Sequence, residues 1–230
     1  MVLPDAIPGM TAQNVAASMS GCAGQRCMAA SAMIGVGNVD AIIDKICEEA
    51  KKIVPGENLG AVINKESKER IERFIGEAER DGAKILVDGR NTKVNGKENG
   101  TYVGPTVIDF VTPQMSVATE EIFGPVISIM RTNTVDEALA IENANPYGNA
   151  ASVFTQNGAM ARYIIDHASA GMIGVNVGVP VPREPFSFGG WNESKFGVGD
   201  ITGKSSIEFW TKLKKSTTKW NAEAGVNWMS

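Results

Sequence analysis

The feature that most limits what this chain can fold into is the alternation of amphipathic helical stretches with short β-rich runs along its 230 residues. Over 38–54, apolar residues recur every three or four positions, Asn38 is placed to cap the start, and a Pro-Gly pair follows. A second helical stretch covers 65–80 and closes at Gly82. This alternation predicts an α/β fold with a largely parallel sheet flanked by helices.

The remaining elements continue the same order. Strands are expected at 29–36, 83–87, 103–110, 126–130, 150–154 and 172–177, and further helices at 13–24, 135–143 and 159–168. The stretch 178–199 is rich in Gly, Pro, Ser and Phe and is long for a structureless connection, which indicates a functional loop. Residues 207–214 alternate apolar and polar side chains, so we expect a strand there that pairs in another subunit.

Composition narrows the function classes. A net charge of −4 argues against nucleic-acid or acidic membrane partners, and no apolar run or N-terminal pattern predicts a membrane span or signal peptide. Three cysteines do not form a disulfide framework, so we expect a reducing compartment, the cytoplasm or the mitochondrial matrix in a eukaryote. The single histidine, His167, excludes two-histidine zinc motifs, and no metal site is predicted. Its place near a helix C-terminus favours a surface position.

The three cysteines differ in their surroundings. Cys47 lies on the apolar stripe of a helix and is expected in the core, and Cys22 lies in a helical run and is expected to pack. Cys27 follows a Gly-bearing break between a helix and a β-like run. The break exposes the side chain, and the adjacent Arg26 favours the reactive thiolate. Cys27 is therefore a candidate nucleophile, with a buried structural cysteine as the alternative.

Two further segments carry candidate binding residues. Paired carboxylates at 120–121 are typical of a solvated face, yet they precede Phe-Gly-Pro, a stiff turn that leads into a strand. Such a turn suits a carboxylate that accepts hydrogen bonds from a ribose. The segment 186–191 places aromatic residues on a glycine-rich loop, either as anchors for the loop or as an apolar wall beside a small substrate.

Four segments together resemble the aldehyde dehydrogenase family. Gly-Gln-Arg-Cys at 24–27 is similar to its nucleophile motif, and Glu-Glu-Ile-Phe-Gly-Pro-Val at 120–126 to its cofactor-contacting motif. Asn-Pro-Tyr-Gly at 145–148 and Phe-Gly-Gly at 188–190 match later signatures in the right order. The resemblance runs from about residue 2 to 220, and it covers the catalytic, C-terminal portion of the family.

Within the family, Gly-Gln-Arg-Cys-Met-Ala at 24–29 and the run 174–182 resemble the branch that takes methylmalonate semialdehyde and acylates coenzyme A. Trp-Asn-Glu-Ser at 191–194 departs from the usual Lys-x-Ser-Gly in the way this branch does. The N-terminal cofactor domain is expected to be absent, because no Gly-x-Gly-x-x-Gly segment occurs. In the family, the asparagine that completes the oxyanion hole and the region of the glutamate base belong to the missing portion of the protein. The chain alone is therefore expected to be incomplete and inactive.

The resemblance implies a role for each candidate residue. Cys27 attacks the aldehyde, and its own backbone N–H helps to hold the oxyanion. Glu121 binds the nicotinamide ribose of NAD and Phe123 packs beside it. Arg26 suits the substrate carboxylate, with loop orientation through a salt bridge as its alternative. Phe188 lies beside the small semialdehyde substrate.

The resemblance also implies an overall reaction and organisation. The products are propionyl-CoA or acetyl-CoA and carbon dioxide, with NAD as hydride acceptor and coenzyme A as co-substrate. A catalytic domain is expected over 1–200, a tail with the oligomerisation strand over 201–220, and a disordered end over 221–230, in an enzyme that forms a homodimer or homotetramer. The alternatives are a hydrolytic aldehyde dehydrogenase for another small semialdehyde, and a non-catalytic fragment that only assembles with partner chains.

Overall fold

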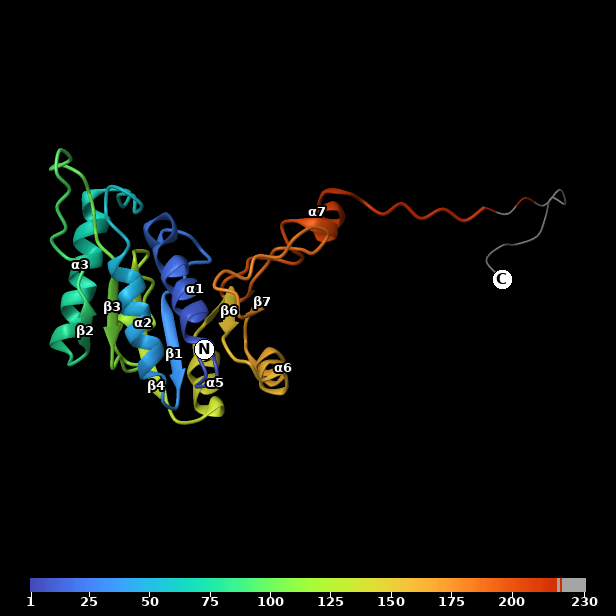
Figure 1. Cartoon of the computed structure of the whole chain (residues 1–230). Helices are drawn as coiled ribbons and strands as arrows, with labels where there is room; N and C mark the ends of the chain where they lie inside the picture. The colour runs from blue at the N-terminus through green and yellow to red at the C-terminus, as the bar shows by residue number, and fades with distance from the viewer. Residues whose placement is uncertain (219, 221–230) are drawn as a thin grey trace.

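The main sheet of the computed structural model, which describes residues 1–218 and 220, contains four strands in the order β1-β4-β3-β2 (Figure 1). These are β1 (Ala32–Val36), β2 (Lys84–Val87), β3 (Thr106–Asp109) and β4 (Val126–Thr132). β4 pairs in parallel with both β1 and β3, and β2 pairs antiparallel with β3. The predicted α/β fold with a largely parallel sheet is confirmed.

A single residue near the N-terminus joins this sheet to a second, parallel pair, β6 (Ala150–Val153) and β7 (Met172–Val175). Val2 forms parallel bridges with Gly35 of β1 and with Phe154, the residue directly after β6. Its N–H donates to the carbonyl of Ile34 at 2.9 Å, and the next N–H, of Leu3, donates to Phe154 at 3.0 Å. Val2 thus makes the two sheets continuous. β5 (Tyr147–Gly148) and β8 (Trp191–Asn192) form a separate short antiparallel ribbon.

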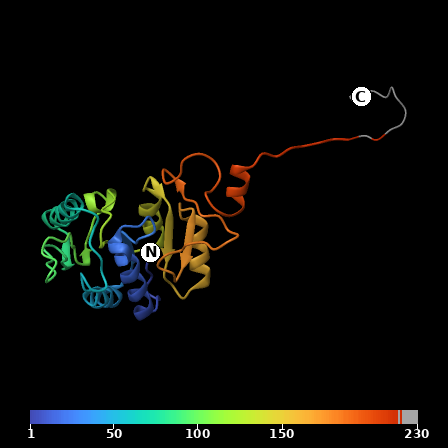
Figure 2. The same ribbon diagram turned by 90° about the horizontal axis from the view of Figure 1, so that it is seen from above.

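Helices cover both faces of the main sheet. They are α1 (Pro8–Ser20), α2 (Asp40–Lys51), α3 (Lys65–Arg80), the short α4 (Ser116–Thr119) and α5 (Val135–Asn143), whereas α6 (Gly158–His167) lies beside β6 and β7 (Figure 1). On β4, Ile127 and Ile129 face the core that α1 and α2 cover, whereas Val126 and Met130 face the core that α3 covers. This two-sided burial explains why β4 is apolar on both faces. In both views α3 and α6 lie at opposite ends of this body (Figure 2).

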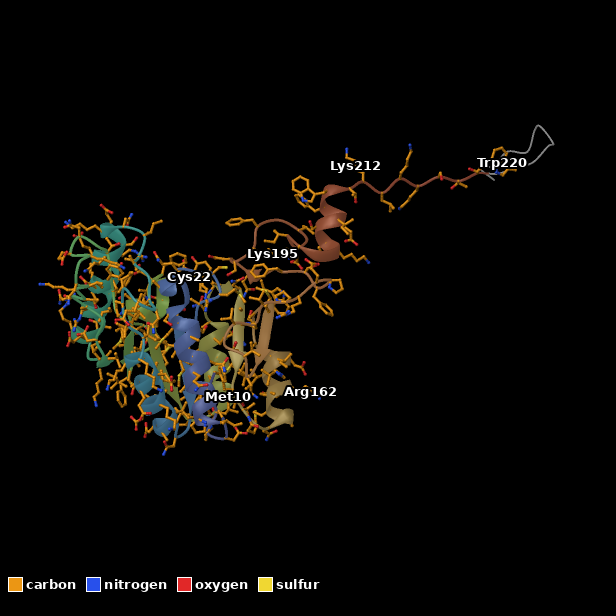
Figure 3. The ribbon with its side chains drawn as sticks, turned by 45° about the horizontal axis from the view of Figure 1, so that its top comes forward. Met10, Cys22, Arg162, Lys195, Lys212 and Trp220 are labelled. Carbon is orange, nitrogen blue, oxygen red and sulfur yellow. The ribbon has the colours of Figure 1, made fainter. Side chains whose placement is uncertain are left out.

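The region before Cys27 departs from the expected helix over 13–24. The helix α1 begins earlier, at Pro8, where a missing N–H costs nothing, and ends at Ser20. A 3-10 turn, Gly21–Gly24, follows, in which Cys22 and Ala23 have left-handed φ values of 53° and 55°. Cys22 is therefore exposed on a turn rather than packed in a helix, which corrects its predicted position. Figure 3 shows Cys22 at the end of α1 opposite Met10.

Several boundaries are tighter than expected. α2 begins at Asp40 with Val39 at the N-cap position, and the Asn38 side chain instead accepts the N–H of Asp40 at 3.1 Å. The strand expected over 103–110 contracts to β3, because Pro105 has no N–H to donate and Phe110 has a φ of 57°. The helix α3 has its expected bounds, and Gly82 follows it with a φ of 100°.

The strand expected over 207–214 is wrong. The structure places a helix, α7 (Gly203–Trp210), there, followed by extended chain. A strand without a neighbour leaves its N–H and C=O groups unpaired, whereas a helix pairs them within the segment. The tail leads away from the body in Figures 1 and 2. The disordered end expected over 221–230 lies outside the described residues. Within the described residues, no helix is both long and apolar enough to cross a membrane.

Candidate active site

Cys27 lies on a tight turn between the 3-10 segment and β1, and its side chain is exposed. The turn closes when the N–H of Ala29 donates to the carbonyl of Arg26 at 3.0 Å. Ser31 then pairs with Ser128 of β4, which ties the loop to the sheet. No hydrogen-bond acceptor within the described chain takes the N–H of Cys27. That N–H is available to an oxyanion beside the thiol.

Two glycines, Gly24 and Gly124, allow the loop that carries Cys27 (residues 24–27) to pack closely against the turn that follows Glu121. Gly24 has a φ of 71°, and a Cβ built on it would overlap the carbonyl oxygen of Gly124. Gly124 in turn lies so close to α3 that a Cβ there would sit 2.6 Å from the Ile71 side chain. The close approach therefore requires glycine at both positions. It brings the segments 24–27 and 120–126 together although they are about a hundred residues apart in the sequence.

A cavity of about 80 Å³ lies between these two segments. Four of the five predicted site residues line it: Arg26, Cys27, Glu121 and Phe123. Phe188, the fifth, does not line it. Its backbone N–H donates to Thr202 Oγ1 at 2.8 Å, within the tail. Its place beside the substrate stays a prediction.

The segment that carries Glu121 is held by a residue that the sequence did not indicate. Arg70 of α3 donates to the carbonyls of Glu121 at 2.9 Å and Ile122 at 2.6 Å. The Glu121 carboxylate is exposed and forms no ion pair with any described residue. Phe123 is 39% exposed and has a φ of 53°. Both of these exposed residues line the cavity.

Arg26 is anchored to the end of α1. One of its terminal nitrogens donates to the carbonyls of Ala17 and Ser18 at 3.2 and 3.3 Å, where a cation complements the helix dipole. Within the described chain no acidic side chain pairs with Arg26, and its buried Nε has no partner. The salt bridge considered as the alternative role of Arg26 is therefore absent among these residues, and its guanidinium has carbonyl partners on α1 but no carboxylate partner.

Cys47 and His167, two other titratable residues considered from the sequence, do not line this cavity. Cys47 is half-buried, and burial raises the pKa of its thiol. His167 is exposed at the end of α6, and its ring nitrogen Nδ1 contacts the carbonyl of Tyr163 at 2.7 Å. Among the described residues, no group of three or more His, Cys, Asp or Glu side chains could hold a metal ion.

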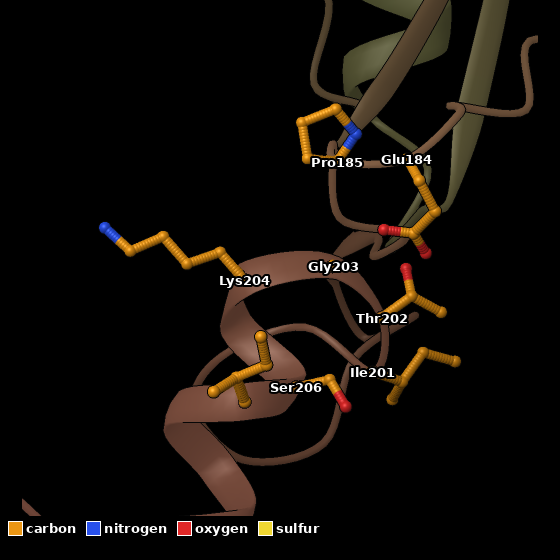
Figure 4. A pocket seen from close by; sticks show the side chains of 8 residues that line it. Glu184, Pro185, Ile201, Thr202, Gly203, Lys204 and Ser206 are labelled. Carbon is orange, nitrogen blue, oxygen red and sulfur yellow. The ribbon is translucent and has the colours of Figure 1, made fainter.

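A larger hollow of about 500 Å³ lies in the tail, between the residues after Glu184 and the start of α7 (Figure 4). Lys204 points outward from it, and none of the predicted site residues lines it. Of the two cavities, the one beside Cys27 holds the candidate chemistry.

A family comparison decides the assignment of this site. The family model described as "Aldehyde dehydrogenase family" matches residues 1–216. The chain belongs to the aldehyde dehydrogenase family. The resemblance inferred from the segments around Cys27 and Glu121 is therefore confirmed for the whole body of the fold.

Named relatives of this aldehyde dehydrogenase chain include two mitochondrial proteins. This chain is 44% identical over 229 residues to the acylating methylmalonate-semialdehyde/malonate-semialdehyde dehydrogenase of Bos taurus. The aligned region covers 97% of this chain and 43% of that protein. It is also 45% identical over 228 residues to the acylating methylmalonate-semialdehyde dehydrogenase of Arabidopsis thaliana. That alignment covers 96% of this chain and 37% of the relative. This aldehyde dehydrogenase chain thus spans less than half the length of these relatives.

Two solved structures share its fold closely. Methylmalonate-semialdehyde dehydrogenase from Oceanimonas doudoroffii gives a TM-score of 0.93 at 39% identity, covering 96% of this chain and 47% of that one. A Sinorhizobium meliloti 1021 protein, provisionally given the same name and complexed with NAD, gives a TM-score of 0.93 at 38% identity. The superposition covers 97% of this chain and 47% of that one.

Proposed function

We propose that this chain is the nucleophile-bearing portion of an NAD-dependent dehydrogenase that converts methylmalonate or malonate semialdehyde to propionyl-CoA or acetyl-CoA and carbon dioxide. The observation that carries the proposal is the cavity in which Cys27, Arg26, Glu121 and Phe123 meet. The names of the relatives from Bos taurus and Oceanimonas doudoroffii support the substrate class.

The Glu121 turn fits one end of NAD. An exposed carboxylate without an ion pair within the described chain accepts hydrogen bonds from the two ribose hydroxyls, and Phe123 offers a flat apolar face. Arg70 fixes the backbone from which both side chains project. NAD, when bound, accepts the hydride from the aldehyde carbon. We propose that most other NAD contacts come from a cofactor domain outside these 230 residues.

Cys27 performs the covalent chemistry in this proposal. Its thiolate sulfur forms a bond to the aldehyde carbon, the carbonyl π bond breaks, and the oxygen takes up the negative charge. The outward N–H of Cys27 donates to that oxygen. Once the hydride has left, the C=O bond re-forms and the acyl group is a thioester of Cys27. The C–C bond to the neighbouring carboxylate then breaks, carbon dioxide leaves, and the electron pair passes into the thioester enolate, which takes up a proton from solvent. Coenzyme A thiolate then attacks the thioester carbon, and Cys27 leaves as its thiolate.

Arg26 recognises the substrate carboxylate in this proposal. Its guanidinium is oriented by the α1 carbonyls, lines the cavity, and has no acidic partner within the described chain. A carboxylate in the substrate supplies the missing negative charge. The helix contact and the substrate contact are compatible, because the α1 carbonyls engage only one terminal nitrogen of a group with five N–H donors.

We also propose how the chain is organised. Residues 1–200 form the catalytic unit and the tail over 201–220 mediates homo-oligomer assembly, now through α7 and the chain after it rather than a predicted strand over 207–214. The support is a run of exposed apolar side chains, with Trp210 80% and Leu213 84% exposed. Phe188 is proposed to reach the substrate in that assembly. The proposed compartment is the cytoplasm, or the mitochondrial matrix in a eukaryote.

The product identifies the reaction. An enzyme of the family that carries this chain, given methylmalonate semialdehyde, NAD and coenzyme A, should form NADH and propionyl-CoA in equal amounts. Cys27→Ser should abolish both. Free acid formed at the same rate without coenzyme A would favour the hydrolytic alternative, and no NADH under any condition would favour the assembly fragment.

A further inference from the structure

The peptide units on either side of Cys27 are fixed by different parts of the chain. The unit before it contains the Arg26 carbonyl, which accepts the N–H of Ala29 at 3.0 Å. Because C=O and N–H point in opposite directions in a trans peptide, this bond aims the N–H of Cys27 away from the turn. The unit after it contains the Cys27 carbonyl. That oxygen accepts Nδ2 of Asn149 at 2.9 Å, across 122 positions in the sequence.

Asn149 is itself mounted rigidly. It lies between Gly148, the last residue of β5, and Ala150, the first of β6, and both neighbours pair with other strands. Its side chain is confined, since a Cβ built on Gly190 would approach Asn149 Oδ1 to 3.2 Å. Nδ2 also lies 3.4 Å from Met28 Sδ, directly after the nucleophile. The half-buried side-chain amide of Asn149 therefore has a fixed position, and it holds the Cys27 loop from a distant part of the chain.

Arg26 and Ser31 fix the two ends of this segment, but few other hydrogen bonds reach the residues next to Cys27. The neighbouring N–H of Ala30 donates to the buried hydroxyl of Ser18 at 3.1 Å, and the N–H of Cys27 has no acceptor within the described chain. The turn bond of Ala29 fixes one side of Cys27, and Asn149 fixes the other. Together they leave Cys27 little freedom in φ and ψ, and so limit the directions of its Sγ and its N–H.

We propose that Asn149 is a positioning residue for the nucleophile: its amide holds the Cys27 carbonyl so that thiol and N–H face the same carbonyl of a bound aldehyde. This inference rests on the proposed function of Cys27. Asn149 does not touch substrate in the proposal. It acts through the backbone that carries the reacting group.

The test compares variants of the chain in the absence of any cofactor. Asn149→Asp keeps the shape of the side chain but cannot donate from its carboxylate, and Asn149→Leu removes the polar group. Asn149→Gln keeps the donor on a longer arm and should rescue in part. Asn133→Asp is the matched control, because Asn133 is exposed on the loop before α5 and its side chain makes no hydrogen bond within the described residues.

Two NMR measurements, amide exchange and a carbonyl chemical shift, report on the conformation of the Cys27 loop. The amide exchange rates of Ala29 and Ala30 should rise about three- to tenfold in Asn149→Asp and Asn149→Leu, the effect of one lost hydrogen bond. The ¹³C resonance of the Cys27 carbonyl should shift upfield in the same variants. Exchange of the β4 amides and the spectrum of Asn133→Asp should remain as in the wild type.

A labelled aldehyde separates this proposal from the proposed function. [¹³C]Propionaldehyde adds to a thiol by forming an S–C bond while the thiol proton moves to oxygen, and its adduct with Cys27 should weaken about three- to tenfold in the variants. The adduct is also measured in an enzyme that carries this chain: if none forms there while the loop signals change as expected, the nucleophile assignment fails and the role of Asn149 in holding the loop stands. Unchanged exchange at Ala29 and Ala30, or an equal rise across β4, overturns the positioning role.

Discussion

At the scale of single residues, exposure separates the cysteines into two kinds. Cys22 and Cys27 are exposed on turns, whereas Cys47 is half-buried and has a raised pKa because burial disfavours its thiolate. The sequence indicated Cys47 correctly from its helical stripe. It did not indicate the exposure of Cys22, because two non-glycine residues in a left-handed turn carry no local signal.

Brief treatment with iodoacetamide near neutral pH should label Cys27 at least about threefold faster than Cys47, because the thiolate is the reacting form. Peptide mapping by mass spectrometry measures the two rates. Cys22→Ser serves as the control and should leave their ratio unchanged. Faster labelling of Cys47 would contradict both its burial and the exposed turn at Cys27.

Substrate choice tests Arg26 in an enzyme that carries this chain. Arg26→Leu should lower kcat/KM for methylmalonate semialdehyde about 10- to 150-fold more than for propionaldehyde, since a charge-assisted contact is worth about 1.5–3 kcal/mol. Arg26→Lys should recover part of the loss, because an ammonium keeps the charge without the fork. Equal losses for both aldehydes would leave Arg26 with its contact to α1 alone.

At the scale of elements, the sequence predicted those whose stability is local. The apolar stripe and closing glycine of α3 fix its bounds, and the apolar run of β4 reflects burial on both faces. The tail misled the prediction, because alternation over 207–214 matches a strand while α7 pairs its own backbone. Contacts such as Asn149 to Cys27 and Arg70 to Glu121 depend on the three-dimensional fold, so no spacing in the sequence encodes them.

The contact between the Cys27 loop and the Glu121 turn depends on Gly24. Gly24→Ala should destabilise the fold by about 1–3 kcal/mol, the cost of a left-handed non-glycine residue, with the overlap at Gly124 added. Gly158→Ala is the control, since nothing lies within 4 Å of its Cβ and the change should be neutral or stabilising. Urea unfolding measures both. Equal stability of the two variants would mean that the loops do not meet as described.

At the scale of the whole molecule, the chain spans 43% of its Bos taurus relative, yet Cys27, the proposed nucleophile, and Glu121, the carboxylate proposed to bind a ribose, line one cavity. What is missing for tight NAD binding is a glycine-rich turn at a helix N-terminus for the phosphates. The Gly-x-Gly-x-x-Gly pattern typical of such a turn does not occur in these 230 residues.

These 230 residues alone should therefore show no saturable heat with NAD up to millimolar concentration, a binding free energy of about 4 kcal/mol. Isothermal titration calorimetry makes the measurement. An enzyme of the family that joins this chain to a cofactor domain provides the positive control under the same conditions. Micromolar affinity of the chain alone would mean that the Glu121 turn carries far more of the cofactor than one ribose.

The acyl group on the nucleophile tests the central claim most directly. An enzyme that carries this chain, incubated with methylmalonate semialdehyde and NAD but without coenzyme A, should accumulate a propionyl thioester on Cys27, found by peptide mapping at low pH. Adding coenzyme A should release it as propionyl-CoA. An acyl group on Cys22, or NADH formation with no acyl group on Cys27, would contradict the account.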